Sequence, residues 1–197
     1  MRIILGLTGP TGAGKSSVTQ IAAKKGIKVI DCDLYARKAT EKGSKGLSAL
    51  VKAFGDEILY NDGELNRKAL ARIAFSSYDK TQLLNKTILP FIEELILAEI
   101  NTDKVLLDAP TLFESGMDKI CSKTVAVLAD RDKRLKRIIE RDGISDEDAI
   151  IRINAGKSDE FFKNNADYVI YNNDDEETFL RDISLLLDKI YGGNSDE

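Results

Sequence analysis

Five short runs of apolar residues are spaced along the chain, and polar residues do not alternate with apolar ones inside them. The runs occupy residues 2–7, 27–30, 104–107, 124–128 and 168–170. Strands of this kind are buried on both faces, as in a parallel sheet that helices cover on both sides. Helical patterns separate the runs, as the crossover connections of parallel strands require. The pattern predicts an α/β fold with a doubly wound, parallel five-stranded sheet.

The interval between the second and third runs is too long for a simple crossover. Residues 35–101 contain several helical stretches, among them residues 66–75 and a helix that begins at Pro90, since proline suits the first turn of a helix. We expect this segment to form a helical insertion on the substrate side of the sheet.

The interval between the fourth and fifth runs, residues 131–164, predicts a helical lid. Its pattern indicates one helix over Arg131–Asp142 and a second over Ser145–Asn164, with a break after Asp142. Ser145 followed by Asp148 resembles an N-terminal capping box. The core of a single domain is then expected over residues 1–34, 102–130 and 165–191, with a last helix over 176–191 and a disordered tail over 192–197.

The first apolar run leads directly into the pattern G-x-x-x-x-G-K-S. Glycines in such a loop let backbone N–H groups point at the phosphates of a nucleotide, and the lysine adds a positive charge. The serine hydroxyl can bind Mg²⁺, and the helix that follows presents its positive end to the anion. The residues expected to hold the nucleotide are Gly9, Pro10, Thr11, Gly12, Ala13, Gly14, Lys15, Ser16 and Ser17.

Acidic residues follow two of the predicted strands at their carboxyl ends, where parallel sheets place ligand-handling groups. Asp31 and Asp33 are separated by one residue, so in an extended segment both carboxylates face the same way, one toward Mg²⁺ and the other toward a hydroxyl. A helix cap in a solvated turn is the alternative for this pair. Asp108 ends a run of the Walker-B form, in which the acid binds Mg²⁺ or its water. The alternative is that Asp108 caps the next turn.

Three arginines share one face of the first lid helix. Arg134, Arg137 and Arg141 lie at positions i, i+3 and i+7. Such a row is usually a solvated surface, but an arginine from a lid can also stabilise charge on a phosphoryl group in transfer. We assign that function to Arg141, with Arg137 as the second choice.

Composition narrows the chemistry. The 197 residues include no histidine, which excludes Ser-His-Asp, Cys-His and His-zinc mechanisms. A net charge of −4 argues against nucleic acid as a partner, because no basic excess can neutralise its backbone. No apolar run is long enough for a membrane span, and Met1 leads directly into the first strand, so we expect a cytoplasmic protein with no membrane partner.

Several motifs together resemble, in order and spacing, those of the dephospho-CoA kinase family. They are Gly6–Ser16, Asp31–Arg37, Gly63–Leu70, Asp108–Glu114 and Ala166–Asn172. The resemblance covers residue 3 to about residue 190 and implies the three-layer P-loop NTPase fold. Leu89 stands where the family usually has His, and Arg134 where it usually has Gln.

This resemblance implies that ATP phosphorylates the ribose 3′-hydroxyl of dephospho-CoA, giving coenzyme A and ADP. Asp33 would be the base or would orient the hydroxyl, and Arg141 would act from the lid, with Lys15 as a further catalytic group. The implied substrate-binding residues are Asp31, Asp33, Arg67 and Asp108, and the implied Mg²⁺ ligands are Ser16, Asp31 and Asp108. A monomer is favoured as the oligomeric state.

Two alternatives remain open at this point. The first is a nucleoside or nucleotide kinase with the same core and another acceptor. The second is a non-catalytic nucleotide-binding protein or switch. The switch is disfavoured because Asn85–Ile88 ends in Ile where the guanine motif N-K-x-D has Asp, and D-x-x-G does not occur.

Overall fold

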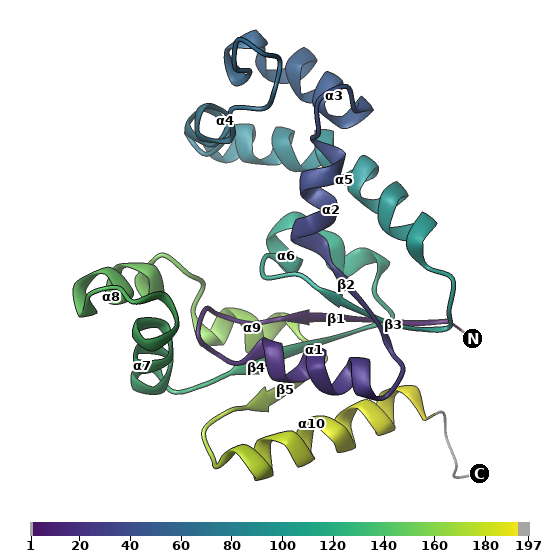
Figure 1. Ribbon diagram of the computed structural model, residues 1–197, viewed down its shortest axis with the longest axis vertical. Helices are drawn as coiled ribbons and strands as arrows, with labels where there is room; N and C mark the ends of the chain where they lie inside the picture. The colour runs from purple at the N-terminus through teal and green to yellow at the C-terminus, as the bar shows by residue number, and fades with distance from the viewer. Residues whose placement is uncertain (1, 193–197) are drawn as a thin grey trace. The chain divides into compact units, whose positions relative to one another are not determined.

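Five strands form a single sheet in the computed structural model, which describes residues 2–192 (Figure 1). The strands are β1 (Ile3–Thr8), β2 (Lys28–Asp31), β3 (Lys104–Asp108), β4 (Lys123–Leu128) and β5 (Tyr168–Tyr171). They lie in the order β2-β3-β1-β4-β5. β1 pairs parallel with β3 and β4, and β4 pairs parallel with β5. The predicted α/β fold is confirmed, and each strand bound lies within one residue of its expected place.

Helices connect the strands. They are α1 (Lys15–Lys24), α2 (Cys32–Ala39), α3 (Lys45–Phe54), α4 (Arg67–Ala74), α5 (Tyr78–Glu99), α6 (Leu112–Ser115), α7 (Arg131–Asp142), α8 (Asp146–Asn154), α9 (Asp159–Asn165) and α10 (Glu176–Tyr191), with 3-10 turns η1 (Asp56–Ile58) and η2 (Met117–Ile120). The expected helices over 66–75, 131–142 and 176–191 are confirmed as α4, α7 and α10. The disordered tail was expected over residues 192–197, of which 193–197 lie outside the described residues.

The chain divides into two compact units. The first contains the sheet with α1 and α7 to α10, and takes in the described residues up to Ile30, Thr102–Phe113 and those from Asp118 onward. The second contains α2 to α5 and comprises Asp31–Asn101 with Glu114–Met117. The insertion expected over residues 35–101 falls within the second unit, and the segment expected as a lid falls within the first.

Helices cover both faces of the sheet in the first unit, which makes it three-layered (Figure 1). Successive side chains of a strand point to opposite faces. Leu5 and Leu7 of β1 therefore share one core with Val18 of α1 and with the apolar stripe of α10. On the other face, Leu128 of β4 packs with Phe162 of α9. Each face of the sheet in the first unit therefore carries an apolar core.

The second unit has its own apolar core, and its longest helix corrects one prediction. A helix beginning at Pro90 was expected, but Pro90 lies inside α5, which begins after the cap Ser77. Proline in a helix interior costs about 3 kcal/mol. Apolar side chains on both sides of it offset that cost, because Ile88 packs against the core of this unit and Ile96 is fully buried.

The segment after α7 corrects a second prediction. The continuous helix expected over Ser145–Asn164 is two helices, α8 and α9. Gly156 lies in the interruption, where glycine weakens a helix. Ser158 then caps α9, since its hydroxyl accepts a hydrogen bond from the N–H of Phe161. The predicted cap at Ser145 is confirmed by its bond from the N–H of Asp148.

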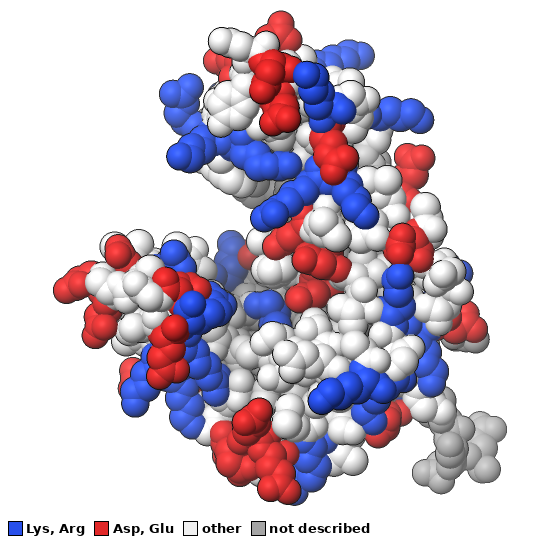
Figure 2. Space-filling view, viewed as in Figure 1, with Lys and Arg blue, Asp and Glu red and all other residues white. Residues whose placement is uncertain are grey.

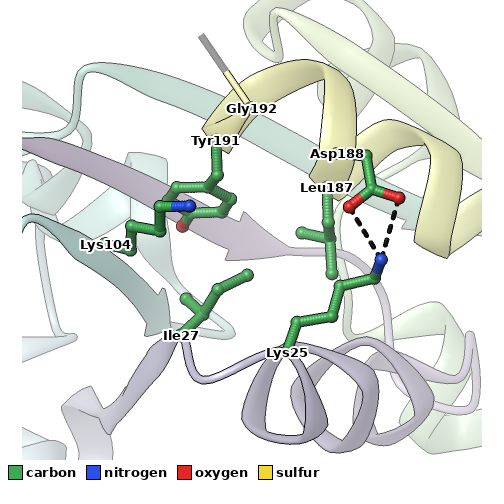
Figure 3. Close-up of a pocket in the computed structure, with 7 residues that line it drawn as sticks. All are labelled: Lys25, Ile27, Lys104, Leu187, Asp188, Tyr191 and Gly192. Carbon is green, nitrogen blue, oxygen red and sulfur yellow. Dashed lines mark hydrogen bonds and ion pairs between the residues drawn. The ribbon is translucent and has the colours of Figure 1, made fainter.

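The end of α10 is fixed to the sheet at the edge where β3 begins (Figure 3). The hydroxyl of Tyr191 donates to the Val105 carbonyl at 2.6 Å, and burial raises the pKa of that hydroxyl above its usual range. Lys25 and Asp188 pair at 2.7 Å beside a pocket of about 80 Å³. This pocket lies at the amino end of β3, whereas the glycine-rich loop follows the carboxyl end of β1.

Among the described residues, no helix is both long and apolar enough to cross a bilayer.

Candidate active site

Close packing explains three glycines of the loop between β1 and α1. Gly9, Gly12 and Gly14 have φ angles of +140°, +78° and +105°, which L side chains rarely adopt. A Cβ atom at Gly9 would lie 2.2 Å from the carbonyl oxygen of Val127, and one at Gly12 would lie 2.8 Å from that of Arg134. The loop therefore needs glycine at these positions both for its backbone path and for its contacts.

Side chains of the first unit hold carbonyl oxygens of this loop. The ammonium of Lys15 donates to the Gly9 carbonyl at 2.8 Å. The amide of Asn172, which follows β5 and is buried, donates to the Ala13 carbonyl at 2.8 Å. Because α1 begins at Lys15, the first N–H groups and the positive end of that helix adjoin the loop. This arrangement can bind an anion such as a nucleotide phosphate.

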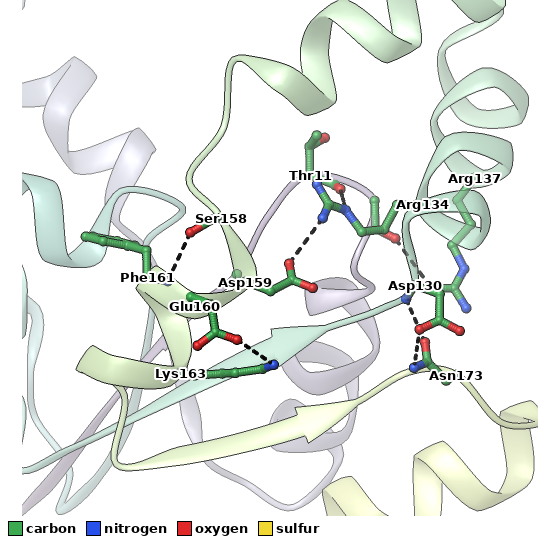
Figure 4. Close-up of polar contacts among 12 residues, drawn as sticks. Thr11, Asp130, Arg134, Arg137, Ser158, Asp159, Glu160, Phe161, Lys163 and Asn173 are labelled. Atoms are coloured by element: carbon green, nitrogen blue, oxygen red, sulfur yellow. Dashed lines mark hydrogen bonds and ion pairs between the residues drawn. The ribbon is translucent and has the colours of Figure 1, made fainter.

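Two arginines of α7 contact the same loop. Figure 4 shows Arg134 directed at Thr11, and its Nε donates to the Thr11 carbonyl at 3.0 Å. Arg137 extends Nη1 to within 3.4 Å of the Gly12 carbonyl, and its Nη2 donates to the carbonyl and the side-chain oxygen of Asn172 at 3.1 Å each. Burial lowers the pKa of the Arg134 guanidinium from its usual value. The base of the predicted lid is thus hydrogen-bonded to the loop between β1 and α1, residues 9–14, which is the predicted phosphate loop.

Arg141, the lid residue to which a catalytic function was assigned, contacts a different partner. Its guanidinium binds both carboxylate oxygens of Asp142, at 2.7 and 2.8 Å, and its side chain is 61% exposed. Arg152 donates to the same carboxylate. These hydrogen bonds, with that from Arg141 foremost, hold the pKa of Asp142 below its usual value. The action of Arg141 on a phosphoryl group stays a prediction.

The geometry expected of Asp31 and Asp33 is wrong. The two residues do not share one extended segment, because β2 ends at Asp31 and α2 begins at Cys32. Asp31 is the cap of α2, and its Oδ1 accepts hydrogen bonds from the N–H groups of Asp33 (2.9 Å) and Leu34 (3.3 Å). The alternative interpretation as a helix cap is therefore correct for Asp31. Asp33 lies in the first turn of α2 and is exposed.

Asp108 and Ser16 offer the hard oxygen atoms that Mg²⁺ prefers. Asp108 is the last residue of β3 and lies in register with Leu7 of β1, so it stands at the carboxyl edge of the sheet. Ser16 lies in the first turn of α1, next to the loop. Within residues 2–192, three or more acidic or cysteine side chains do not gather into a metal site. Mg²⁺ takes few protein ligands and completes its shell with water and phosphate.

Arg67, expected to bind substrate, begins α4 in the second unit. Its Nη2 donates to the Thr40 hydroxyl at 2.9 Å, and Thr40 itself is buried at the end of α2. The contact holds α4 to α2. Whether Arg67 also binds substrate stays a prediction.

Sequence reasoning missed the contacts of Asn172 and Arg134 with the loop. Asn172 lay in a motif quoted for the family resemblance, but without a function. Arg134 carried a charge pattern typical of a solvated face, whereas its side chain is only 6% exposed. Over α7 and α8, Figure 2 shows Lys and Arg interspersed with Asp and Glu. Charge alone therefore does not distinguish the buried Arg134 from the exposed charged residues of these helices.

Comparisons with known proteins agree with one another. The model of the dephospho-CoA kinase family matches residues 3–177. A dephospho-CoA kinase of Arabidopsis thaliana is 43% identical over 88% of this chain and 77% of its own length, and one of Pseudoalteromonas translucida is 38% identical over 95% and 90%. The crystal structure of TT1252 from Thermus thermophilus, 30% identical, superposes with a TM-score of 0.77 over 97% of this chain and 99% of its own.

Proposed function

The chain belongs to the dephospho-CoA kinase family, and from that premise we propose that it transfers the terminal phosphoryl group of ATP to the ribose 3′-hydroxyl of dephospho-CoA. The products are coenzyme A and ADP. The observation that carries this proposal is the loop between β1 and α1, whose glycines have positive φ and whose carbonyl oxygens are held by Lys15, Arg134, Arg137 and Asn172.

The proposed reaction needs charge neutralisation and positioning more than covalent catalysis. The hydroxyl oxygen attacks the terminal phosphorus, the bond from that phosphorus to the bridging oxygen breaks, and ADP leaves with the electron pair. The proton of the hydroxyl passes to the carboxylate of Asp33. Asp33 suits this function because it is exposed and lies just beyond the carboxyl end of β2.

Lys15 and the loop amides bind the phosphates in this proposal. The hydrogen bond from Lys15 to the Gly9 carbonyl is a local one, so the ammonium can exchange that carbonyl for a phosphate oxygen. The N–H groups at the start of α1 add donors and a favourable dipole. Arg141 would neutralise charge on the phosphoryl group once it leaves Asp142.

Magnesium is the metal that the donor set fits. Ser16 and Asp108 would hold it, and when bound it would neutralise phosphate charge. Asp31 is a weaker candidate than the sequence indicated, because one of its carboxylate oxygens already accepts two backbone hydrogen bonds. A cytoplasmic location, a monomeric state and the absence of a nucleic-acid partner stay predictions.

An acceptor panel tests the proposal. Purified protein is incubated with Mg²⁺-ATP and, in parallel, dephospho-CoA, adenosine and common mononucleotides, and product masses are measured. The expected result is the gain of a single phosphate on dephospho-CoA alone. Phosphorylation of adenosine or of a mononucleotide in its place would identify another kinase, and ATP binding without any product would identify a non-catalytic binding protein.

A further inference from the structure

Arg134 is a buried cation that joins α7, α9 and the phosphate loop (Figure 4). Its Nε donates to the Thr11 carbonyl at 3.0 Å, and its Nη1 lies 3.4 Å from a carboxylate oxygen of Asp159 in the first turn of α9. Burying a guanidinium is costly unless it is paired and hydrogen-bonded. The side chain of Asp159 is 44% exposed, so solvent screens its charge and weakens its stabilisation of the buried guanidinium. The hydrogen bond to Thr11, at 3.0 Å, is the shorter of the two contacts.

The tip of the loop also packs against the backbone of α7 at this residue. The carbonyl oxygen of Arg134 is only 2.8 Å from the place that a Cβ atom of Gly12 would occupy. Gly12 thus contacts the backbone of Arg134, while Thr11 contacts its side chain. Arg134 therefore contacts both residues that flank the Thr11–Gly12 peptide unit, and Ile138 of α7 also lies beside Gly12, with Cγ1 3.1 Å from the same Cβ position.

The orientation of that peptide unit matters for an anion. Peptide bonds are trans in the described residues, so the C=O and the N–H of one peptide unit point in opposite directions. Because the Thr11 carbonyl points at the guanidinium of Arg134, the N–H of Gly12 points away from that guanidinium. An N–H group held in this way can donate to a phosphate oxygen without first turning its peptide plane.

We propose that Arg134 is a positioning residue for ATP: by holding the Thr11 carbonyl, it fixes the Thr11–Gly12 peptide so that the Gly12 N–H is presented to the phosphates. This inference rests on the proposed function of the loop amides. The property that matters is the N–H donor, and the positive charge is secondary. A neutral donor of similar reach should therefore replace arginine, whereas an apolar side chain of similar size should not.

Four proteins separate these possibilities. Arg134→Met removes the donor and keeps most of the volume, and Arg134→Gln keeps an N–H donor without the charge. Lys136→Met removes a charge from an exposed position of α7 and is the matched control. For these and the wild type, calorimetry measures Mg²⁺-ATP affinity, and initial rates give the KM for ATP and for dephospho-CoA separately.

Arg134→Met should weaken ATP binding about tenfold and raise the KM for ATP by the same factor. One charge-assisted hydrogen bond contributes about a factor of ten to an equilibrium constant. Its KM for dephospho-CoA should stay within about twofold of the wild-type value, because the loss is confined to the nucleotide. Arg134→Gln should stay within about threefold and Lys136→Met within about twofold of wild-type ATP affinity. A purely structural function of Arg134 would affect both KM values alike.

Wild-type ATP affinity in folded Arg134→Met would overturn the proposal, and so would an Arg134→Gln protein as weak as Arg134→Met. If Arg134→Met does not fold, the amide resonances of the wild type decide. The Gly12 N–H signal should shift when Mg²⁺-ATP is added, together with that of Gly14. A shift of Gly14 without Gly12 overturns this inference alone, whereas no shift at any loop amide overturns the proposed function.

Discussion

Asn172 offers the sharpest test of the contacts behind the phosphate loop. Its side chain donates to the Ala13 carbonyl at 2.8 Å and accepts from Arg137 at 3.1 Å, and the residue is only 8% exposed. The next residue, Asn173, also makes two side-chain hydrogen bonds, both with Asp130, at 2.7 and 2.8 Å, but Asn173 is only half-buried and Asp130 is exposed. Each asparagine side chain thus donates one hydrogen bond and accepts one, and the two residues differ in burial, so Asn173 can serve as the control.

Asn172→Ala leaves a buried carbonyl and a guanidinium each short of a partner, at about 1–3 kcal/mol per group. Arg137 keeps its bond to the backbone carbonyl of residue 172, so we expect a total loss of roughly 2–4 kcal/mol in the free energy of unfolding. Asn173→Ala should cost about 1 kcal/mol or less, because water replaces the lost partners. For a chain of this length, the Asn172 change should lower Tm by roughly 5–15 °C.

Urea unfolding of the wild type and both variants measures these differences directly. A third variant, Asn172→Asp, keeps the shape but places an oxygen against the Ala13 carbonyl, and it should lose at least as much stability as Asn172→Ala. Equal losses for Asn172→Ala and Asn173→Ala would show that burial does not set the energetic value of these contacts.

Four further predictions concern the site and its pH dependence. Asp33→Asn should leave ATP affinity nearly intact while kcat falls about 10²-fold or more, measured by calorimetry and initial rates. Lys15→Ala should weaken ATP binding and lower kcat by a similar factor in the same assays. Gly12→Ala should fold poorly or lose ATP affinity, by circular dichroism and calorimetry, because φ is +78° there. Burial tends to raise the pKa of Asp167, but hydrogen bonds from Thr124 outweigh it and leave that pKa lowered. The stability that this lowered pKa contributes is fully present above the pKa of the carboxyl in the unfolded state, about 3.9. It is lost as the pH falls through the pKa of the carboxyl in the folded state. Asp167→Asn should therefore flatten the acid limb of a stability-against-pH curve, and an unchanged limb would contradict this.

The strands could be predicted because their signal is local. A run such as residues 124–128 has to be buried on both faces, and β4 is. The loop could be predicted for a similar reason, since Gly9, Gly12 and Gly14 have backbone angles that other residues rarely adopt. In both cases the physical requirement acts on the residues that display the pattern.

Two of the failures arose where distant contacts decide. Pro90 is tolerated inside α5 because apolar side chains before and after it are packed. A rule based on the local sequence does not take this packing into account. Arg134 appears in the sequence as part of a charged helix face, and only the fold reveals its burial against Thr11. Asp31 could have been placed correctly, since an aspartate directly before a helix is a common cap.

In the proposed function, the loop between β1 and α1 binds the phosphates of ATP. Titration of the intact wild-type chain with Mg²⁺-ATP in a calorimeter, beside Lys15→Ala, measures this binding. We expect saturable single-site binding below millimolar concentration by the wild type and clearly weaker binding by the variant. An absence of binding by the wild type up to millimolar concentrations would contradict it.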